Sequence, residues 1–299
     1  MHIPKSITET YELKNGVKIP CFGYGTYMFR VDHETSVDRI RHAAQIGYRL
    51  FDTASFYMNE QGLGEALRTC GVPREELFVS SKIWNMEQGY DSTIASFNET
   101  LEDMQFDYLD MYLIHWPIAY GHDDDWQFMV KETWRAMTDL YKQGKIRVLG
   151  VSNFLQHHLA VLDGEEVPVC VDELERNLGY PQDEIHDFCH ENGIVTISYS
   201  PLRGINKEWP LIASLSEKYG KNAAQIVLRW NVQQGSIPIP RSYTYEHMQS
   251  NMEVFDFELT DEEMAAISAL VDVPGPDERP RQHPDVDRIN MDRHFKTKI

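Results

Sequence analysis

Three residues that can take part in acid–base chemistry each end a short apolar run. These are Asp52, Lys82 and His115, and Tyr57 lies five residues beyond Asp52. A phenol is a weak acid with a reference pKa near 10. An ammonium group about 4 Å away stabilises the phenolate by roughly 4 kcal/mol at an effective dielectric of 20, which lowers the pKa by up to about 3 units. The four residue types therefore suit a general acid, Tyr57, that Lys82 activates.

The remaining two residues fit the same chemistry. Asp52 would pair with Lys82 and hold it in place, and His115 would donate a hydrogen bond to an incoming carbonyl. Hydride delivery to a carbonyl carbon creates an oxygen that needs a proton, and the hydride must come from a cofactor. Taken singly, each residue has a plainer interpretation. Asp52 could cap a helix near Asn59, Lys82 could be solvated, and His115 could be a buried core histidine.

Other polar residues also end apolar runs, and the interpretation depends on their convergence. They are Ser152-Asn153, Glu173, Tyr199 and Arg241-Ser242. If the runs are parallel strands of one barrel, their carboxyl ends meet on the face where barrel active sites lie. The sequence therefore predicts a single polar ring around one mouth.

The elements that must position this ring alternate along the chain. Eight short apolar runs are typical of strands buried on both faces, and helical periodicity fills the segments between them. Asp91 and Asn222 are expected to open two of these helices. The predicted strands are Cys21–Tyr24, Tyr48–Asp52, Leu77–Lys82, Tyr108–His115, Arg147–Ser152, Val169–Leu174, Val195–Tyr199 and Ile237–Pro240.

The count of eight favours a (β/α)8 barrel, although alternation alone also permits a doubly wound sheet. Eight units need about 250 residues, so we expect one domain over residues 1–299. An N-terminal segment, 1–20, contains a predicted β-hairpin with strands Tyr11–Leu13 and Val17–Ile19 and an Asn15-Gly16 turn. A Pro-rich, charged tail, 272–299, is expected to form a long C-terminal loop.

Composition excludes several classes of function. The formal net charge is -19, which argues against nucleic acid as a partner. The N-terminus shows no signal peptide and no run is long enough to span a bilayer, so we expect no membrane association and a cytoplasmic protein. The four cysteines show no CxxC pair, which fits a reducing compartment, and no metal site is expected. A monomer or weak oligomer is expected.

Six motifs, in order and at matching spacing, resemble those of the aldo-keto reductase family. The resemblance runs from about Leu13 to Leu270 and implies a (β/α)8 barrel that reduces aldehydes or ketones with a nicotinamide cofactor. It also implies a catalytic tetrad of Asp52, Tyr57, Lys82 and His115, with Tyr57 as proton donor. The motifs are Phe51–Ala54 with Tyr57, Ser81–Trp84, Tyr112–Pro117, Gly150–Phe154, Tyr199–Leu202 and Ile239–Ser242.

The same resemblance implies positions around the cofactor. Gly25 and Thr26 would lie beside it, Ser152, Asn153 and Glu173 would bind the nicotinamide carboxamide, and Tyr199 would stack on the nicotinamide ring. Ser200 and Leu202 would lie near the pyrophosphate. Arg241, Ser242, His247 and Asn251 would hold the adenosine end, and Trp84 and Trp116 would wall the substrate pocket. For both tryptophans, an ordinary place in the core is the alternative.

The chain departs from the family pattern at two places. Asp172 and Glu173 stand where the family usually has Asn and Gln, and a carboxylate lacks the donor of an amide. His247 stands where an arginine is common. Arg241 and Ser242 still offer a seat for a ribose 2′-phosphate, so we expect NADPH to be preferred over NADH, with NADH possible.

Two other functions remain open from sequence alone. The same fold could serve as a cofactor-sensing or regulatory protein with incidental turnover, but the intact tetrad favours catalysis. An isomerase on a similar barrel would need no nicotinamide, and the cofactor motifs count against it. Aromatic residues near the predicted mouth suggest an apolar or aromatic carbonyl as the small-molecule substrate.

Overall fold

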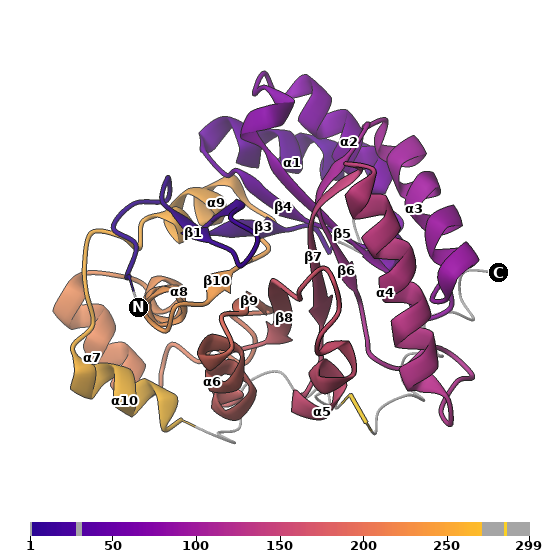
Figure 1. Ribbon diagram of the computed structural model, residues 1–299. Coiled ribbons are helices and arrows are strands. Elements are labelled where there is room, and N and C mark those ends of the chain that lie inside the picture. Colours follow the sequence, from indigo (N-terminus) through magenta and orange to yellow (C-terminus); the bar gives the residue numbers. More distant parts are fainter. Residues whose placement is uncertain (1, 28–31, 271–283, 286–299) are drawn as a thin grey trace.

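A nearly closed barrel of eight parallel strands forms the centre of the protein, as predicted (Figure 1). The computed structural model describes residues 2–27, 32–270 and 284–285. Each strand pairs in parallel with the next one along the chain. The strands are β3 (Gly23–Gly25), β4 (Leu50–Asp52), β5 (Phe78–Ile83), β6 (Leu109–Ile114), β7 (Ile146–Ser152), β8 (Val171–Glu175), β9 (Val195–Tyr199) and β10 (Ile237–Pro238).

The first and last strands, β3 and β10, meet through a single backbone hydrogen bond. The Gly25 N–H donates to the Pro240 carbonyl at 3.4 Å. A Cβ on Gly25 would lie 2.8 Å from the carbonyl oxygen of Ile239, which is closer than carbon and oxygen normally approach. Glycine at this position therefore allows the two ends of the sheet to come together.

The predicted hairpin is present and covers one end of the barrel. Strands β1 (Thr10–Glu12) and β2 (Lys18–Pro20) pair antiparallel, and Gly16 takes a positive φ of 78° in the turn. Leu13 and Ile19 pack into the apolar barrel interior. Most strands contribute one or more inward-facing residues to that interior. These are Leu50, Phe78, Met111, Leu113, Val148, Val171, Ile197 and Ile237.

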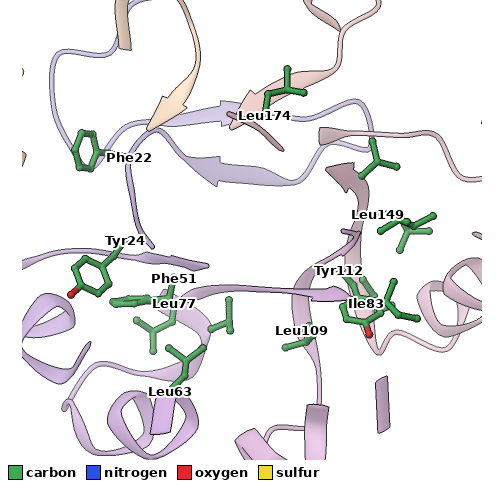
Figure 2. Packing of buried hydrophobic residues seen from close by; sticks show 14 of the residues in the cluster. Phe22, Tyr24, Phe51, Leu63, Leu77, Ile83, Leu109, Tyr112, Leu149 and Leu174 are labelled. Carbon is green, nitrogen blue, oxygen red and sulfur yellow. The ribbon is translucent and has the colours of Figure 1, made fainter. Parts of the chain in front are cut away.

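Helices surround the strands, and a larger apolar layer lies between the two (Figure 1). In Figure 2, Tyr24, Phe51 and Leu63 show this packing between β3, β4 and α2. The α-helices are α1 (His33–Ile46), α2 (Glu60–Thr69), α3 (Tyr90–Met104), α4 (Trp126–Lys142), α5 (Gln156–Leu159), α6 (Asp183–Glu191), α7 (Pro210–Tyr219), α8 (Ala223–Gln233), α9 (Tyr245–Met252) and α10 (Asp261–Ser268). Three short 3-10 helices are η1 (Ser55–Tyr57), η2 (Arg74–Glu76) and η3 (Ala160–Leu162).

The two predicted helix starts had different outcomes. Asn222 caps α8, and its side chain accepts from the Gln225 N–H in a capping box, as expected. Asp91 does not open α3, because that helix begins at Tyr90 with Gly89 as its N-cap. The glycine φ of 108° turns the chain into the helix before the acidic residue is reached. Asp52 caps no helix, since α2 begins after Asn59.

Two glycines on α2 make a matched pair for a stability prediction. A Cβ on Gly64 would lie 2.2 Å from the carbonyl oxygen of Met104, whereas a Cβ on Gly62 would make ordinary 3.5 Å contacts with His33 and Val37. We expect Gly64→Ala to destabilise the protein by about 1–3 kcal/mol through overpacking. Gly62→Ala should be neutral or stabilise it by up to about 1 kcal/mol, because alanine favours helix. Urea unfolding of both variants measures the difference, and equal effects would contradict the close approach of α2 to Met104.

Most of the predicted C-terminal loop lies outside the described residues, apart from Pro284 and Asp285. Asp285 Oδ1 lies 3.0 Å from Nε2 of the buried His158 and 3.2 Å from Nε2 of His157. His158 Nδ1 accepts from the Leu155 N–H, so Nε2 carries the proton that faces Asp285. The side chains of His157, His158 and Asp285 thus place potential metal-ligating atoms within 4.8 Å of one another, and His157 Nε2 is within hydrogen-bonding distance of Asp285. Within the described part of the chain, no helix is both long and apolar enough to cross a membrane.

Candidate active site

The predicted polar residues share one face of their strands. Side chains alternate along a strand, so residues two apart point the same way. Asp52 follows the inward-facing Leu50 by two positions, and His115 follows Leu113 in the same way. The same spacing links Ser152 to Gly150 and Val148, Glu173 to Val171, and Tyr199 to Ile197. The alternation thus places the whole set above the apolar interior, at the carboxyl ends of the strands.

Lys82 lies at the centre of this set and is fully buried. Its Nζ donates to Asp52 Oδ2 at 2.5 Å and to the Thr53 carbonyl at 3.0 Å. A third oxygen, Glu173 Oε1 on β8, lies 3.2 Å from the same nitrogen. The expected Asp52–Lys82 pair is present, and a second carboxyl group from across the barrel joins it.

Burial and charge act in opposite directions on the Lys82 ammonium. Burial lowers its pKa, but Asp52 and Glu173 outweigh burial and leave the pKa raised. Burial raises the Glu173 pKa well above its ordinary value, the nearby Asp52 adds to the effect, and Lys82 opposes it. Lys82 is therefore a cation at neutral pH, and Glu173 has a strong tendency to hold a proton.

Tyr57 lies at the end of η1, and its ring centroid is 5.4 Å from Lys82 Nζ. Burial raises its pKa, and the opposing effect of Lys82 is smaller, with Asp52 and Glu173 both adding to the rise. The sequence-based expectation of a lowered pKa is therefore wrong for this site. That expectation included the effect of the ammonium on the Tyr57 pKa. It left out the burial of the phenol and the charge of the second carboxyl group.

His115 lies beside Tyr57, with ring centroids 5.8 Å apart. Burial, reinforced by Lys82, lowers its pKa well below the ordinary value, so the imidazole is neutral. Its backbone is held by the Ile83 carbonyl, which accepts from the His115 N–H at 3.2 Å. A neutral imidazole has one N–H to donate, as hydrogen bonding to a carbonyl oxygen requires.

Aromatic side chains cover one side of this arrangement. Trp84 and Trp116 are buried and form a small cluster with Phe56 and the partly buried Tyr57. Phe56 stacks on Trp84 with centroids 4.0 Å apart, and Trp84 lies 5.0 Å from the His115 ring. Both predicted pocket tryptophans therefore lie next to the tetrad. Phe56 was not identified from sequence, although its place beside Tyr57 was a usable signal.

On the opposite side, Ser152, Asn153 and Tyr199 form a hydrogen-bonded group. Tyr199 Oη donates to Asn153 Oδ1 at 2.9 Å, and Asn153 Nδ2 lies 3.0 Å from both Ser152 Oγ and the His115 carbonyl. Asn153 takes a positive φ of 62° at the end of β7. Ser152 Oγ donates to the Glu173 carbonyl at 2.8 Å. These contacts link β6, β7, β8 and β9 at the mouth.

Residues from β3 and from the segment after β9 border the same mouth. Thr26 is buried, and both its N–H and its hydroxyl donate to the Asp52 carbonyl. Gly25 precedes it at the closure of the barrel. Ser200 is exposed with a positive φ of 48°, and Leu202 is partly buried two residues later. The structure thus brings these four near the ends of β3 and β9.

Of the four residues predicted for the adenosine end, Arg241 and Ser242 lie in the segment after β10, and His247 and Asn251 lie on α9. Asn251 Nδ2 donates to Ser242 Oγ at 2.9 Å, and both residues are buried. Arg241 and His247 are exposed, and Nη1 of Arg241 donates to the Tyr27 carbonyl. The Arg241 guanidinium also lies 4.6 Å from the Tyr243 ring centroid.

A second arginine, which the sequence did not indicate, lies at this end. Arg39 on α1 lies 5.3 Å from the Tyr243 ring, and its Nη1 is buried with no hydrogen-bond partner among the described residues. It lines a cavity of about 450 Å³ together with residues of the 243–246 segment, although Asp38 and Glu34 line it too. The sequence held no signal for Arg39, since it occupies an ordinary position in an amphipathic helix.

Asp172 and Glu173 point in opposite directions from β8. Asp172 is buried on the outer side of the barrel, where Cys189 Sγ of α6 lies 4.0 Å from its Oδ2. Burial raises the Asp172 pKa well above its ordinary value, although the Phe154 N–H lowers it in part. Glu173 therefore points to the mouth and Asp172 away from it, so the two acidic residues have separate surroundings.

A family model described as the aldo/keto reductase family matches residues 21–272. The chain belongs to the aldo-keto reductase family. It is 42% identical to the glyoxal reductase of Bacillus subtilis (strain 168) over 285 residues, which covers 95% of this chain and 99% of that protein. It is 38% identical to the 9,11-endoperoxide prostaglandin H2 reductase of Trypanosoma cruzi, covering 86% of this chain and 90% of that one.

Solved aldo-keto reductases share the fold. A crystal structure of an aldo-keto reductase from a Medee basin deep-sea metagenome library matches with a TM-score of 0.84 and 33% identity, covering 92% of this chain and 98% of the other. A Bombyx mori aldo-keto reductase in complex with NADP matches with a TM-score of 0.80 and 30% identity, covering 91% and 94%. This aldo-keto reductase is thus an oxidoreductase on the expected (β/α)8 barrel.

Proposed function

We propose that this aldo-keto reductase reduces aldehydes or ketones to alcohols with NADPH, using Tyr57 as the general acid. The observation that supports this most directly is the meeting of Tyr57, His115 and the Asp52–Lys82 pair at one mouth of the barrel. A phenol, a neutral imidazole and a buried ammonium at one place suit the protonation of a carbonyl oxygen as a hydride reaches its carbon.

Each of the four side chains has a distinct task in this proposal. The substrate oxygen lies between Tyr57 Oη and the N–H of the neutral His115, which orients the carbonyl. A reduced nicotinamide, when bound, supplies the hydride to the carbonyl carbon. Tyr57 transfers its proton to the oxygen as negative charge develops there, and Lys82 stabilises the phenolate that remains. Asp52 holds Lys82 in position and balances its charge.

The chain has groups that fit a nicotinamide cofactor. Ser152 and Asn153 carry a hydroxyl and an amide, the kinds of group that hydrogen-bond a carboxamide, and here they are hydrogen-bonded to each other at 3.0 Å. Glu173 adds a third polar group, and Tyr199 supplies a ring held by Asn153. In this proposal Gly25 and Thr26 lie beside the cofactor, and Ser200 and Leu202 lie near its pyrophosphate. Ser242, Asn251 and His247 hold the adenosine end, with Arg241 on the 2′-phosphate.

Arg241 gives the proposal a test of cofactor preference. Guanidinium–phosphate hydrogen bonds contribute about 1.5–3 kcal/mol, which is about tenfold or more in affinity. We expect Arg241→Met to raise the KM for NADPH by at least about tenfold and to change the KM for NADH by less than about twofold. Arg135→Met removes an exposed arginine of α4, paired with Glu132, and should change neither value. An equal rise for both cofactors would contradict a role at the 2′-phosphate.

The first experiment on the function itself is NADPH consumption by the purified protein. Glyoxal is a sensible first substrate because of the named Bacillus subtilis relative, and an aromatic aldehyde tests the wall formed by Trp84, Trp116 and Phe56. Saturable oxidation of NADPH supports the proposal. Tight binding of NADPH without oxidation by a broad aldehyde and ketone panel would instead favour a cofactor-sensing role.

A further inference from the structure

The oxygens around Lys82 account for every hydrogen of its ammonium group. An ammonium has three N–H donors. Asp52 Oδ2, the Thr53 carbonyl and Glu173 Oε1 lie 2.5, 3.0 and 3.2 Å from Nζ. Two carboxyl groups thus meet one cation inside the barrel, where all three side chains are buried.

Each of the two carboxyl groups has one oxygen left over. Asp52 Oδ1 and Glu173 Oε2 are buried and have no hydrogen-bond partner among the described residues. If both groups were ionised, the trio would carry a net charge of about −1 in a buried site, which is costly. Two carboxyl groups that share a site and cannot both ionise hold one proton between them. A proton on either group would give one of these oxygens a hydrogen to donate.

We propose that Asp52 and Glu173 hold one proton between them around Lys82, and that Glu173 is thereby a positioning residue that controls how readily Tyr57 gives up its proton. This inference extends the proposed function to a residue that differs from the family pattern. Glu173 acts here through Lys82, in addition to any contact with the nicotinamide.

The groups that surround Glu173 support a shared proton. Burial raises its pKa and the Asp52 charge raises it further, while Lys82 opposes both effects. Tyr57 and Tyr199 both interact electrostatically with Glu173, and neither is a cation. The neutral His115 adds no charge. Lys82 therefore supplies the positive charge next to two carboxyl groups, and one positive charge neutralises only one carboxylate.

The shared proton has a consequence for Tyr57. While the proton is present, the carboxyl pair and Lys82 sum to zero charge. When it leaves at alkaline pH, a second negative charge remains near the phenol, and Tyr57 holds its own proton more tightly. Glutamine at position 173 can donate to Asp52 and accept from Lys82 as the protonated acid does, but it has no proton to lose. Glu173→Gln therefore removes the alkaline charge while retaining both hydrogen bonds.

The kinetic test uses alcohol oxidation, because that direction needs the Tyr57 phenolate as base. We expect the pH of half-maximal kcat to fall by about one unit in Glu173→Gln relative to the native protein. Asp172→Asn removes the neighbouring buried carboxyl group on the outer face of β8 and should leave that pH unchanged. An unchanged profile in Glu173→Gln, or an equal shift in both variants, would overturn the inference.

A second readout needs neither substrate nor cofactor. Infrared spectra of the native protein at neutral pH should contain the carbonyl band of a protonated carboxylic acid that disappears in Glu173→Gln and is retained in Asp172→Asn. The band should also fade in the native protein as the pH is raised. If Glu173 is ionised at neutral pH, Glu173→Gln removes no such band, and the inference is wrong even where turnover is normal. Absence of turnover in the native protein would instead refute the proposed function alone.

Discussion

Tyr57→Phe is expected to lower kcat for carbonyl reduction by about 10²–10⁴-fold, the usual contribution of a general acid. The change removes one oxygen and its proton. The ring should keep its place, because its packing against Tyr27, 4.7 Å between centroids, and against His115 involves only the aromatic face and edge. NADPH affinity should therefore change by less than about twofold, since Tyr57 is assigned no contact with the cofactor in the proposed site.

The measurement combines steady-state kinetics with fluorescence titration of NADPH. Tyr219→Phe is the matched control. Tyr219 lies on α7, far along the chain from Tyr57, and its hydroxyl donates a hydrogen bond to Glu263 on α10. That variant should retain native kcat. Turnover by Tyr57→Phe within about threefold of the native protein would remove Tyr57 from the mechanism, and a large loss of NADPH affinity would mean that the substitution disturbs the mouth as a whole.

The direction of the Tyr57 pKa shift also predicts a pH dependence. Reduction needs the phenol in its protonated form, and burial raises its pKa. The proton donor is therefore fully protonated at neutral pH, and loss of activity from its ionisation is expected only at alkaline pH. Oxidation of the alcohol needs the phenolate and should rise with pH over the same alkaline range.

Strand position was sufficient to predict the fold and most of the mouth, and side-chain alternation accounts for the direction in which its residues point. Each of the eight predicted strands overlaps an observed one, and β9 has the predicted bounds. Because an inward-facing apolar residue precedes Asp52 by two positions, the direction of Asp52 followed from a local rule. The same rule applied to Glu173. These inferences needed only neighbours along one strand.

Contacts across the barrel could not be predicted in the same way. Glu173 on β8 reaches Lys82 on β5, three strands away, and that distance depends on barrel diameter and strand stagger. The family resemblance implied a contact of Glu173 with the nicotinamide carboxamide, and nothing in the sequence indicated its contact with Lys82. Arg39 was missed for a related reason, since its contact with Tyr243 depends on how α1 lies against the loop after β10. The unexpected direction of the Tyr57 pKa has the same origin, because burial is a property of the assembled mouth.

Removing the central cation should have the largest effect on stability. Lys82→Met leaves Asp52 and Glu173 buried without a counter-charge, and breaking a buried ion pair in this way costs about 3–5 kcal/mol. The variant should also lose most of its reductase activity, because the phenolate formed from Tyr57 would lack the adjacent ammonium. Urea unfolding at pH 8 measures the first effect, and NADPH oxidation measures the second.

The pH dependence of this loss separates a charge effect from a packing effect. Glu173 already has a pKa raised above its unfolded value, so its folded form favours the neutral acid. The neutral form of Glu173 makes its full contribution to the free energy of unfolding below the pKa of Glu173 in the unfolded chain. This contribution is lost as the pH rises toward the pKa of Glu173 in the folded protein. The deficit of Lys82→Met should therefore be smaller at pH 5 than at pH 8. Lys142→Met, which removes an exposed lysine paired with Glu166, should show no measurable deficit at either pH. A deficit for Lys82→Met that is equal at both pH values would mean that Lys82 stabilises the barrel by packing, and that its charge is not what holds the two carboxyl groups in place.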